Sequence, residues 1–368
     1  MEALIFIIVL SVLVIIHEAG HFLAARRNKI KVKEFGLGYP PRARQLFSWR
    51  GTIFSLNWIP FGGFVQMEGE NGPEEKDSAD SFYNKSIRAR LEVLLAGVFF
   101  NFVFGIVAFA VVFYQLGVPI LLSGQARIQE VLADSPAAAA GLEANTNILA
   151  FQVNGEWIET KEISQIQNLV SANLGETVLV RTSLPCDQEK CPVEFADYSI
   201  YLRNSEEIPS DQGAMGIVFS EMIFKNYPWY QMPFATISQA FKQSFALSAM
   251  ILQALWQMII DLSAGRGLQQ EIAGPIGIVD QAATYGFFDG GWLSILNFAA
   301  LLSINLGIIN LLPIPALDGG RAVLVIMEKF IKRKYLDKVA NYLNYFGYLS
   351  LLALMVLVSF NDIKNLFK

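Results

Sequence analysis

Four long apolar runs constrain this chain more than any other feature. The first covers residues 3–25, and at 1.5 Å per residue a helix of that length crosses a hydrocarbon core of about 30 Å. The others cover residues 91–116, 293–312 and 342–360. Only 17% of the 368 residues are charged and 53% are apolar, whereas a soluble domain is roughly 25% charged. The sequence therefore predicts a multi-pass α-helical membrane protein with four transmembrane helices.

Clusters of Lys and Arg orient these helices. They follow the first run, precede the second, and separate the third from the fourth, and positive loops stay cytoplasmic. Both termini and the long segment between helices two and three are then expected outside. Met1-Glu2 lacks the basic start of a signal peptide, so we expect the first helix to be retained. The predicted segments are helix one at 1–26, a cytoplasmic loop at 27–90, helix two at 91–117, helix three at 293–320, a cytoplasmic loop at 321–340 and helix four at 341–362.

A fifth apolar stretch, residues 234–262, carries a polar stripe. Its polar residues fall within an arc of roughly 100° at helical pitch, which favours a helix lying in the membrane surface. A spanning helix packed on its neighbours by that stripe is the alternative. We therefore expect amphipathic surface helices over residues 228–290. The stripe consists of Gln239, Lys242, Gln243, Gln253, Gln257 and Asp261.

Two parts of the chain have β character. Short β-like runs alternate with Gly, Pro and Asn turn signals between residues 122 and 222, which predicts a β-rich α+β domain inserted outside the membrane. Residues 52–67 alternate loosely around Pro60 and Gly62-Gly63 and predict a membrane-associated β-hairpin on the cytoplasmic side. The net charge of −5 gives no indication of nucleic-acid binding.

The motif His17-Glu18-Ala19-Gly20-His21 lies inside the first apolar run. Residues four apart share a helix face, so both imidazoles can bind one Zn²⁺. The glutamate between them is placed as the general base that takes a proton from water activated by the metal. A buried pair of structural histidines is the alternative, but ionisable groups inside an apolar helix are costly and usually functional. The motif thus predicts a zinc metalloprotease.

A catalytic zinc keeps three protein ligands and an open position. The chain has no third histidine, and both cysteines lie in the predicted external domain, so we expect a carboxylate. Asp318 is the candidate, because Pro313 and Pro315 break the third helix just before it and produce irregular backbone at membrane depth. Glu2 and Asp261 are weaker candidates, since both are expected at the external face.

Three asparagines lie inside the apolar helices. Asn305 and Asn310 either make hydrogen bonds between helices or bind the backbone of an unwound substrate. For Asn101, in the second helix, we favour the structural interpretation.

These residues together resemble the site-2 protease family of intramembrane zinc metalloproteases, in the bacterial branch that cleaves anti-sigma factors (regulator of sigma-E protease-like). The matching segments are the His-Glu-x-x-His motif, Ile59-Pro60-Phe61-Gly62-Gly63-Phe64-Val65, Gly274-Pro275-Ile276-Gly277-Ile278, Asn305-Leu306-Gly307-Ile308-Ile309-Asn310-Leu311-Leu312-Pro313, Leu317-Asp318-Gly319 and Phe360-Asn361-Asp362. Together they cover nearly the whole chain.

The resemblance implies that His17, His21 and Asp318 hold zinc, that Glu18 is the general base, and that Asn305 and Asn310 contact substrate. It also implies that the hairpin pairs with the unwound substrate, with Phe61, Gly62 and Gly63 in contact with it. Residues 135–142 and 153–155 resemble a PDZ domain. Well-known members of the family carry two PDZ domains, and this chain has room for one, which could bind a peptide or protein ligand.

The expected substrate is the transmembrane helix of a single-pass protein, cut within the lipid bilayer of the bacterial plasma (inner) membrane. Release of anti-sigma factors and clearance of signal-peptide remnants are the expected roles. A non-catalytic PDZ scaffold and a membrane zinc protease acting on soluble or peripheral chains are the alternatives. Cys186 and Cys191 flank a short polar turn in the external domain, and we predict that they form a disulfide.

Overall fold

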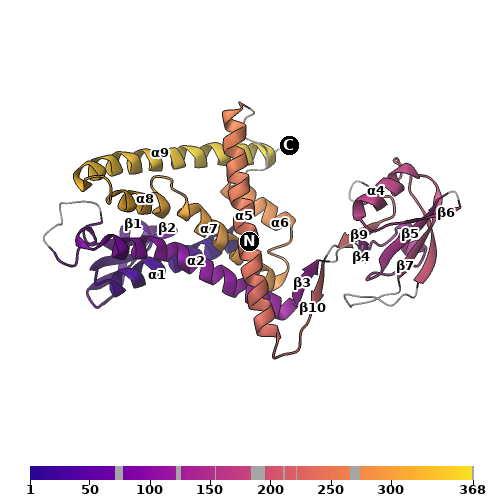
Figure 1. Cartoon of the computed structure of the whole chain (residues 1–368), viewed down its shortest axis with the longest axis horizontal. Coiled ribbons are helices and arrows are strands. Elements are labelled where there is room, and N and C mark those ends of the chain that lie inside the picture. The colour runs from indigo at the N-terminus through magenta and orange to yellow at the C-terminus, as the bar shows by residue number, and fades with distance from the viewer. Residues whose placement is uncertain are drawn as a thin grey trace. The chain divides into compact units, whose positions relative to one another are not determined.

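The computed structural model of the chain (Figure 1) describes most of its residues as two compact units. Unit 1 consists of residues 1–112 and 236–368, and unit 2 of residues 113–235. The predicted Cys186–Cys191 bond lies outside the described residues, as do the side chain of Phe61 and several side chains of the last helix. The described ranges are 1–70, 78–121, 126–153, 155–183, 195–209, 212–220, 222–265 and 274–366.

Three described helices are long and apolar enough to cross a membrane. They are α1 (Glu2–Arg27), α2 (Ile87–Leu116) and α7 (Gly291–Leu311), and they overlap the first three predicted spans. The third was predicted to reach residue 320, but the helix ends at Leu311, before the two prolines. The fourth predicted span lies within the long helix α9 (Arg333–Leu366), which is not among these three. The protein is thus a helical membrane protein with β regions, and a fourth span stays a prediction.

Four further helical segments belong to unit 1 in whole or in most part. They are α5 (Met232–Ser263), α6 (Pro275–Thr284), α8 (Asp318–Met327) and a 3-10 turn, η2 (Phe82–Asn84). The α6 helix begins against α9, because the backbone N–H groups of Gly274 and Gly277 donate to the carboxylate of Asp362, at 3.1 and 2.9 Å. A carboxylate at a helix N-terminus accepts from unpaired N–H groups and complements the helix dipole. Two of the motifs singled out in the sequence therefore meet in space.

The β structure of unit 1 differs from the predicted hairpin. Residues 52–67 are one strand, β2 (Thr52–Met67), and its partner is β1 (Val32–Trp49), which the sequence analysis missed. The two strands are joined by a turn at Arg50-Gly51, where both residues have positive φ. The expected pairing of the two halves of β2 with each other was wrong. Residues 34–37 of β1 are matched both to 53–56 and to 63–66, so they lie between those halves.

A shared core fixes this sheet against the helices that carry the motifs. The Phe22 ring of α1 lies 5.7 Å from the rings of both Phe35 and Phe54, centroid to centroid. Leu94 of α2 and Val325 of α8 belong to the same buried cluster. Full burial of one such side chain contributes roughly 1.5–3 kcal/mol. The cluster thus joins α1, α2, α8 and both strands around the C-terminal half of α1.

Unit 2 is built on a six-stranded antiparallel sheet. The strands lie in the order β8 (Phe195–Tyr201), β7 (Thr177–Ser183), β5 (Asn147–Val153), β4 (Ala126–Val131) and β9 (Ile217–Ser220), and β6 (Glu156–Glu159) also pairs with β5. Alternating residues of these strands pack with Ile166 of α4 (Ile163–Ala172) into one buried core. A separate two-stranded sheet pairs β3 (Val118–Leu121) with β10 (Met222–Lys225). Unit 2 also contains the short helix α3 (Pro136–Ala139).

Candidate metal centre

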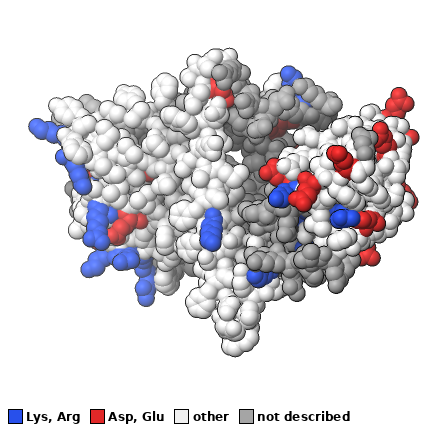
Figure 2. All heavy atoms as spheres, turned by 45° about the vertical axis from the view of Figure 1, so that its right-hand side comes forward, with Lys and Arg blue, Asp and Glu red and all other residues white. Residues whose placement is uncertain are grey.

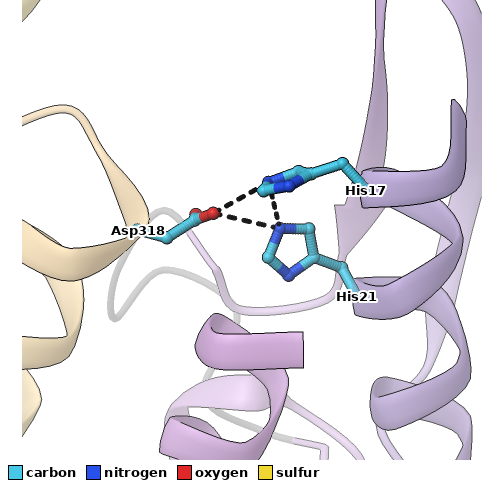
Figure 3. A group of neighbouring side chains, drawn as sticks. All are labelled: His17, His21 and Asp318. Atoms are coloured by element: carbon cyan, nitrogen blue, oxygen red, sulfur yellow. Dashed lines mark hydrogen bonds and ion pairs between the residues drawn. The ribbon is translucent and has the colours of Figure 1, made fainter. Parts of the chain in front are cut away.

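The imidazoles of His17 and His21 project from successive turns of α1 toward the carboxylate of Asp318 (Figure 3). His17 Nε2 lies 2.9 Å from Asp318 Oδ2, and His21 Nε2 lies 3.3 Å from the same oxygen. The two Nε2 atoms are 3.1 Å apart. Both histidines are buried, and inside a membrane helix no bulk water solvates their rings. The fold thus joins a motif near the N-terminus to an acid 301 residues away.

The backbone around Asp318 explains how this acid reaches α1. Helix α7 ends at Leu311, and α8 begins at Asp318 after six residues of irregular backbone that contain both prolines. Ala316 has φ 75°, in the left-handed region that non-glycine residues rarely adopt. A Cβ on Gly319 would collide with the carbonyl oxygen of Leu311, so only glycine lets α8 fold back onto the end of α7. The turn places Asp318 in the first turn of α8, where the helix dipole stabilises a carboxylate.

The spacing and chemistry of the three side chains fit Zn²⁺. Tetrahedral zinc holds nitrogen and oxygen ligands at roughly 2.0–2.2 Å, which places ligand atoms about 3.3 Å from one another. The three separations here, 2.9, 3.1 and 3.3 Å, are close to that value. Two imidazoles and one carboxylate are a known catalytic zinc set that leaves a fourth position open. His17, His21 and Asp318 therefore form one metal-binding group.

Glycines keep room for the metal between α1 and α2. A Cβ on Gly97 of α2 would lie 2.5 Å from Nε2 of His21 and 2.7 Å from Nε2 of His17. A Cβ on Gly20 of α1 would lie 2.5 Å from the carbonyl oxygen of Ala96. The two helices therefore cross at a glycine on each side, and the space in front of the ligating nitrogens stays free. No role was predicted for Gly97 from the sequence.

A cavity of about 410 Å³ opens onto the metal group. Glu18 lines it, and the backbone N–H of Val65 donates a hydrogen bond to the Glu18 carboxylate. Strand β2 thus forms one wall of the cavity directly beside the expected base. The lining residues are Val14, His17, Glu18, His21, Tyr39, Gly62, Gly63, Phe64, Val65, Met67, Glu70, Leu94, Leu306, Asn310, Ala316, Leu317, Asp318 and Arg321.

Three polar residues of this cavity were not singled out from the sequence. Arg321 donates to Glu70 at 2.7 Å, so α8 is tied to the segment that follows β2. Burial, together with the nearby Glu18 and Tyr348, raises the pKa of the Tyr39 phenol. Tyr39 therefore stays protonated at neutral pH and can donate a hydrogen bond into the cavity. Arg321 lies three residues after Asp318, about one helical turn, and could have been found by that spacing, whereas no local pattern marks Tyr39 or Glu70.

The residues predicted to bind substrate are not all in one place. Gly62, Gly63 and Asn310 line the cavity, and Asn305 does not. Five residues along a helix correspond to about 500°, so Asn305 and Asn310 project about 140° apart. The side chain of Phe61 lies outside the described part of the chain, although its backbone belongs to β2.

Comparison with known proteins identifies the family. The model of peptidase family M50 matches residues 5–354. The chain belongs to peptidase family M50. A protein of Helicobacter pylori named "Putative zinc metalloprotease" is 30% identical, with 98% of each chain covered. A Fusobacterium nucleatum protein of the same description is also 30% identical, over the full length of both chains.

A plant protein is also similar to this chain. A protein of Arabidopsis thaliana named "Probable membrane metalloprotease ARASP2, chloroplastic" is 31% identical over 87% of this chain and 70% of its own length. The expectations of a zinc enzyme, of the site-2 protease family and of a multi-pass membrane protein are confirmed. This M50 protein is a membrane zinc metalloprotease with a His-His-Asp metal site.

Proposed function

We propose that this protease hydrolyses peptide bonds within the transmembrane segments of single-pass membrane proteins. The observation that carries the proposal is the depth of the metal group within α1. His21 and His17 lie six and ten residues before the end of that helix, or roughly 9 and 15 Å along its axis at 1.5 Å per residue. A metal centre at that depth in an apolar helix suits a substrate that is itself in the bilayer.

Zinc bound by His17, His21 and Asp318 would supply Lewis acidity, which polarises a peptide carbonyl and lowers the pKa of water toward 7. Glu18 is the proposed general base, because its carboxylate lies in the cavity one residue from His17. The same carboxylate would pass the proton to the departing amide nitrogen. The Val65 N–H bond holds that carboxylate in the cavity wall.

The free edge of β2 is the proposed docking site for an unwound substrate. Residues 63–67 pair with β1 on one side, and among the described residues no strand pairs with them on the other. A transmembrane helix hides its peptide bonds in internal hydrogen bonds, and a strand edge can accept the extended form by β-augmentation. Phe61, Gly62 and Gly63 belong to β2, and Asn310 lines the same cavity as the two glycines. Asn305 is proposed as a contact further from the metal.

The finer assignments rest on charge and resemblance. Figure 2 shows Lys and Arg gathered at one end of unit 1, on the left, and such clusters favour the cytoplasmic side. That supports a bacterial plasma membrane protein with α9 as its fourth span and with both termini and unit 2 outside. Unit 2 is then a single PDZ domain that screens substrates or binds a peptide. Anti-sigma factors and signal-peptide remnants are the proposed substrates, in the manner of the sigma-E branch.

One experiment separates this function from its alternatives. The purified protein is reconstituted in liposomes with a single-pass model substrate, and in parallel with an unfolded soluble protein. We expect zinc-dependent cleavage of the first substrate only, and none with Glu18→Gln. Cleavage of the soluble protein at an equal rate would indicate a protease of peripheral chains. Cleavage of neither, with zinc bound, would favour a scaffold.

A further inference from the structure

One face of α2 lies against both metal-binding imidazoles. Val93, Gly97 and Asn101 follow one another at four-residue intervals, so they share that face. Gly97 lies against the ligating nitrogens, and Val93 and Asn101 lie one turn to either side of it. The carbonyl oxygen of Val93 is 2.8 Å from His21 Nδ1, and the side-chain amide of Asn101 is 3.1 Å from His17 Nδ1. Each ring thus meets one polar group of α2 on the side away from Asp318.

The geometry determines which nitrogen of each ring can carry a hydrogen. Both Nε2 atoms face Asp318 and each other, so Nε2 is the metal-binding nitrogen of each ring. A neutral imidazole that binds metal through Nε2 carries its hydrogen on Nδ1 and donates it to an acceptor. The Val93 carbonyl is that acceptor for His21. His17 needs an acceptor in the same position, and the side-chain amide of Asn101 is the group that lies there.

The Asn101 side chain offers that oxygen. The residue is fully buried, and its Oδ1 has no hydrogen-bond partner while Nδ2 faces His17. A half-turn of the amide about its last bond exchanges the two atoms without changing its shape. Oδ1 then accepts the hydrogen of His17 Nδ1 and is no longer an unpaired buried oxygen.

The backbone of Asn101 is bonded to a second helix independently of its side chain. The hydroxyl of Ser303, in α7, donates to the backbone carbonyl of Asn101 at 2.8 Å, and both residues are fully buried. This bond uses the backbone of Asn101, so it survives any change of the side chain. Contact between α2 and α7 therefore does not require the amide, and the amide is left for His17.

We propose that Asn101 is a positioning residue of the metal site, which accepts a hydrogen bond from His17 Nδ1 and thereby fixes the ring orientation and tautomer that bind zinc. The proposal rests on the zinc site and not on the proposed substrate. It replaces the purely structural interpretation that the sequence favoured for this residue. Outer acceptors of this kind typically change metal affinity by roughly 10- to 100-fold.

The first test is zinc affinity, measured by chelator competition on the detergent-solubilised full-length protein. Asn101→Leu removes the acceptor and should weaken zinc binding by roughly 10- to 100-fold. Asn101→Asp keeps an acceptor oxygen of the same size and should bind within about threefold of the wild type. Ser303→Ala breaks the bond between α2 and α7 and serves as the control with unchanged affinity. Wild-type affinity in Asn101→Leu, or equal weakening in Asn101→Asp, would overturn the proposal.

The second test does not depend on the stability of a variant. The chain has only two histidines, so ¹⁵N-histidine labelling gives two rings in an NMR spectrum. With zinc bound, we expect both Nδ1 atoms to carry a hydrogen, and Asn101→Asp to shift only the His17 signal. A wild-type His17 ring without a hydrogen on Nδ1 would refute the hydrogen bond to Asn101. Loss of zinc-dependent proteolysis with this signal intact would count against the proposed function alone.

Discussion

Gly97 lies directly against the imidazole of His21, and a Cβ added to this glycine would come within 2.5 Å of Nε2. Real Cβ atoms do not approach a neighbour so closely, and the ring cannot retreat without leaving the metal group. The metal group therefore requires a glycine at position 97, because any side chain there would occupy the space beside the ligating nitrogens.

The first prediction concerns that space. Gly97→Ala should reduce the bound zinc well below one per chain, because the methyl group displaces the imidazoles of His17 and His21. Gly105→Ala is the matched control in the same helix, since its Cβ would meet Cδ1 and Cγ1 of Ile304 at 2.6 and 2.8 Å and the carbonyl oxygen of Ala300 at 3.3 Å, and none of these atoms belongs to the metal group. Zinc is measured by elemental analysis of the purified protein. One equivalent of zinc in Gly97→Ala would show that the crossing of α1 and α2 is looser than the structure indicates.

The second prediction concerns the acid. Asp318→Asn replaces an anionic ligand by a neutral amide, so zinc affinity should fall by more than the roughly 10- to 100-fold typical of outer groups. Asp362→Asn is the control, because Asp362 is a buried carboxylate bound to Gly274 and Gly277 at the start of α6. That variant should lose thermal stability and keep its zinc. Unchanged zinc affinity in Asp318→Asn would exclude Asp318 as a ligand.

The metal group could be predicted because each of its residues belongs to a short, recognisable sequence pattern. His17 and His21 lie four residues apart in a single helix, and Pro313, Pro315 and two glycines mark the backbone around Asp318. Tyr39 and Glu70 could not be found in this way. They reach the cavity through the register of β1 against β2 and through the ion pair with Arg321, and neither follows from a local pattern.

The apolar helices α1, α2 and α7 could be predicted from hydropathy alone, since each is one continuous run. The sheet of unit 1 could not. Pro40 and Pro41 interrupt the strand pattern of β1, and residues 34–37 separate the two halves of β2 that were predicted to pair. Pairing between segments depends on a core that includes Phe22 and Leu94, on two other elements.

The third prediction concerns the proposed docking edge. A Cβ on Gly63 would lie 3.1 Å from the carbonyl oxygen of Gly36, 3.5 Å from Cγ of Glu18 and 3.6 Å from Cγ1 of Val14, so Gly63→Leu should project a side chain into the cavity beside Glu18. We expect bound zinc to be unchanged and cleavage of a transmembrane substrate to fall by at least about tenfold, equivalent to roughly 1.4 kcal/mol. Ser48→Leu, on the exposed part of β1, is the control with normal cleavage. Normal cleavage by Gly63→Leu would argue against docking at this edge.

The fourth prediction concerns α5, which is not among the three described helices apolar enough to span. If α5 lies in the external surface of the plasma membrane, a cysteine at Gln253 should react with a membrane-impermeant reagent added outside the cell. The assay uses a background in which both native cysteines are replaced by serine. Labelling only after the cytoplasm is opened would show that α5 crosses, and the order of the spans would have to be revised.

The most direct test of the central claim is the position of the cut. A single-pass substrate is incubated with the reconstituted zinc-loaded protein, and both fragments are identified by mass spectrometry. We expect new termini inside the apolar segment of the substrate. We also expect Glu18→Gln to retain its zinc while losing the roughly 10²- to 10⁴-fold that a general base contributes. Termini found only in the soluble flanks, or full activity in Glu18→Gln, would contradict an intramembrane protease in which Glu18 is the base.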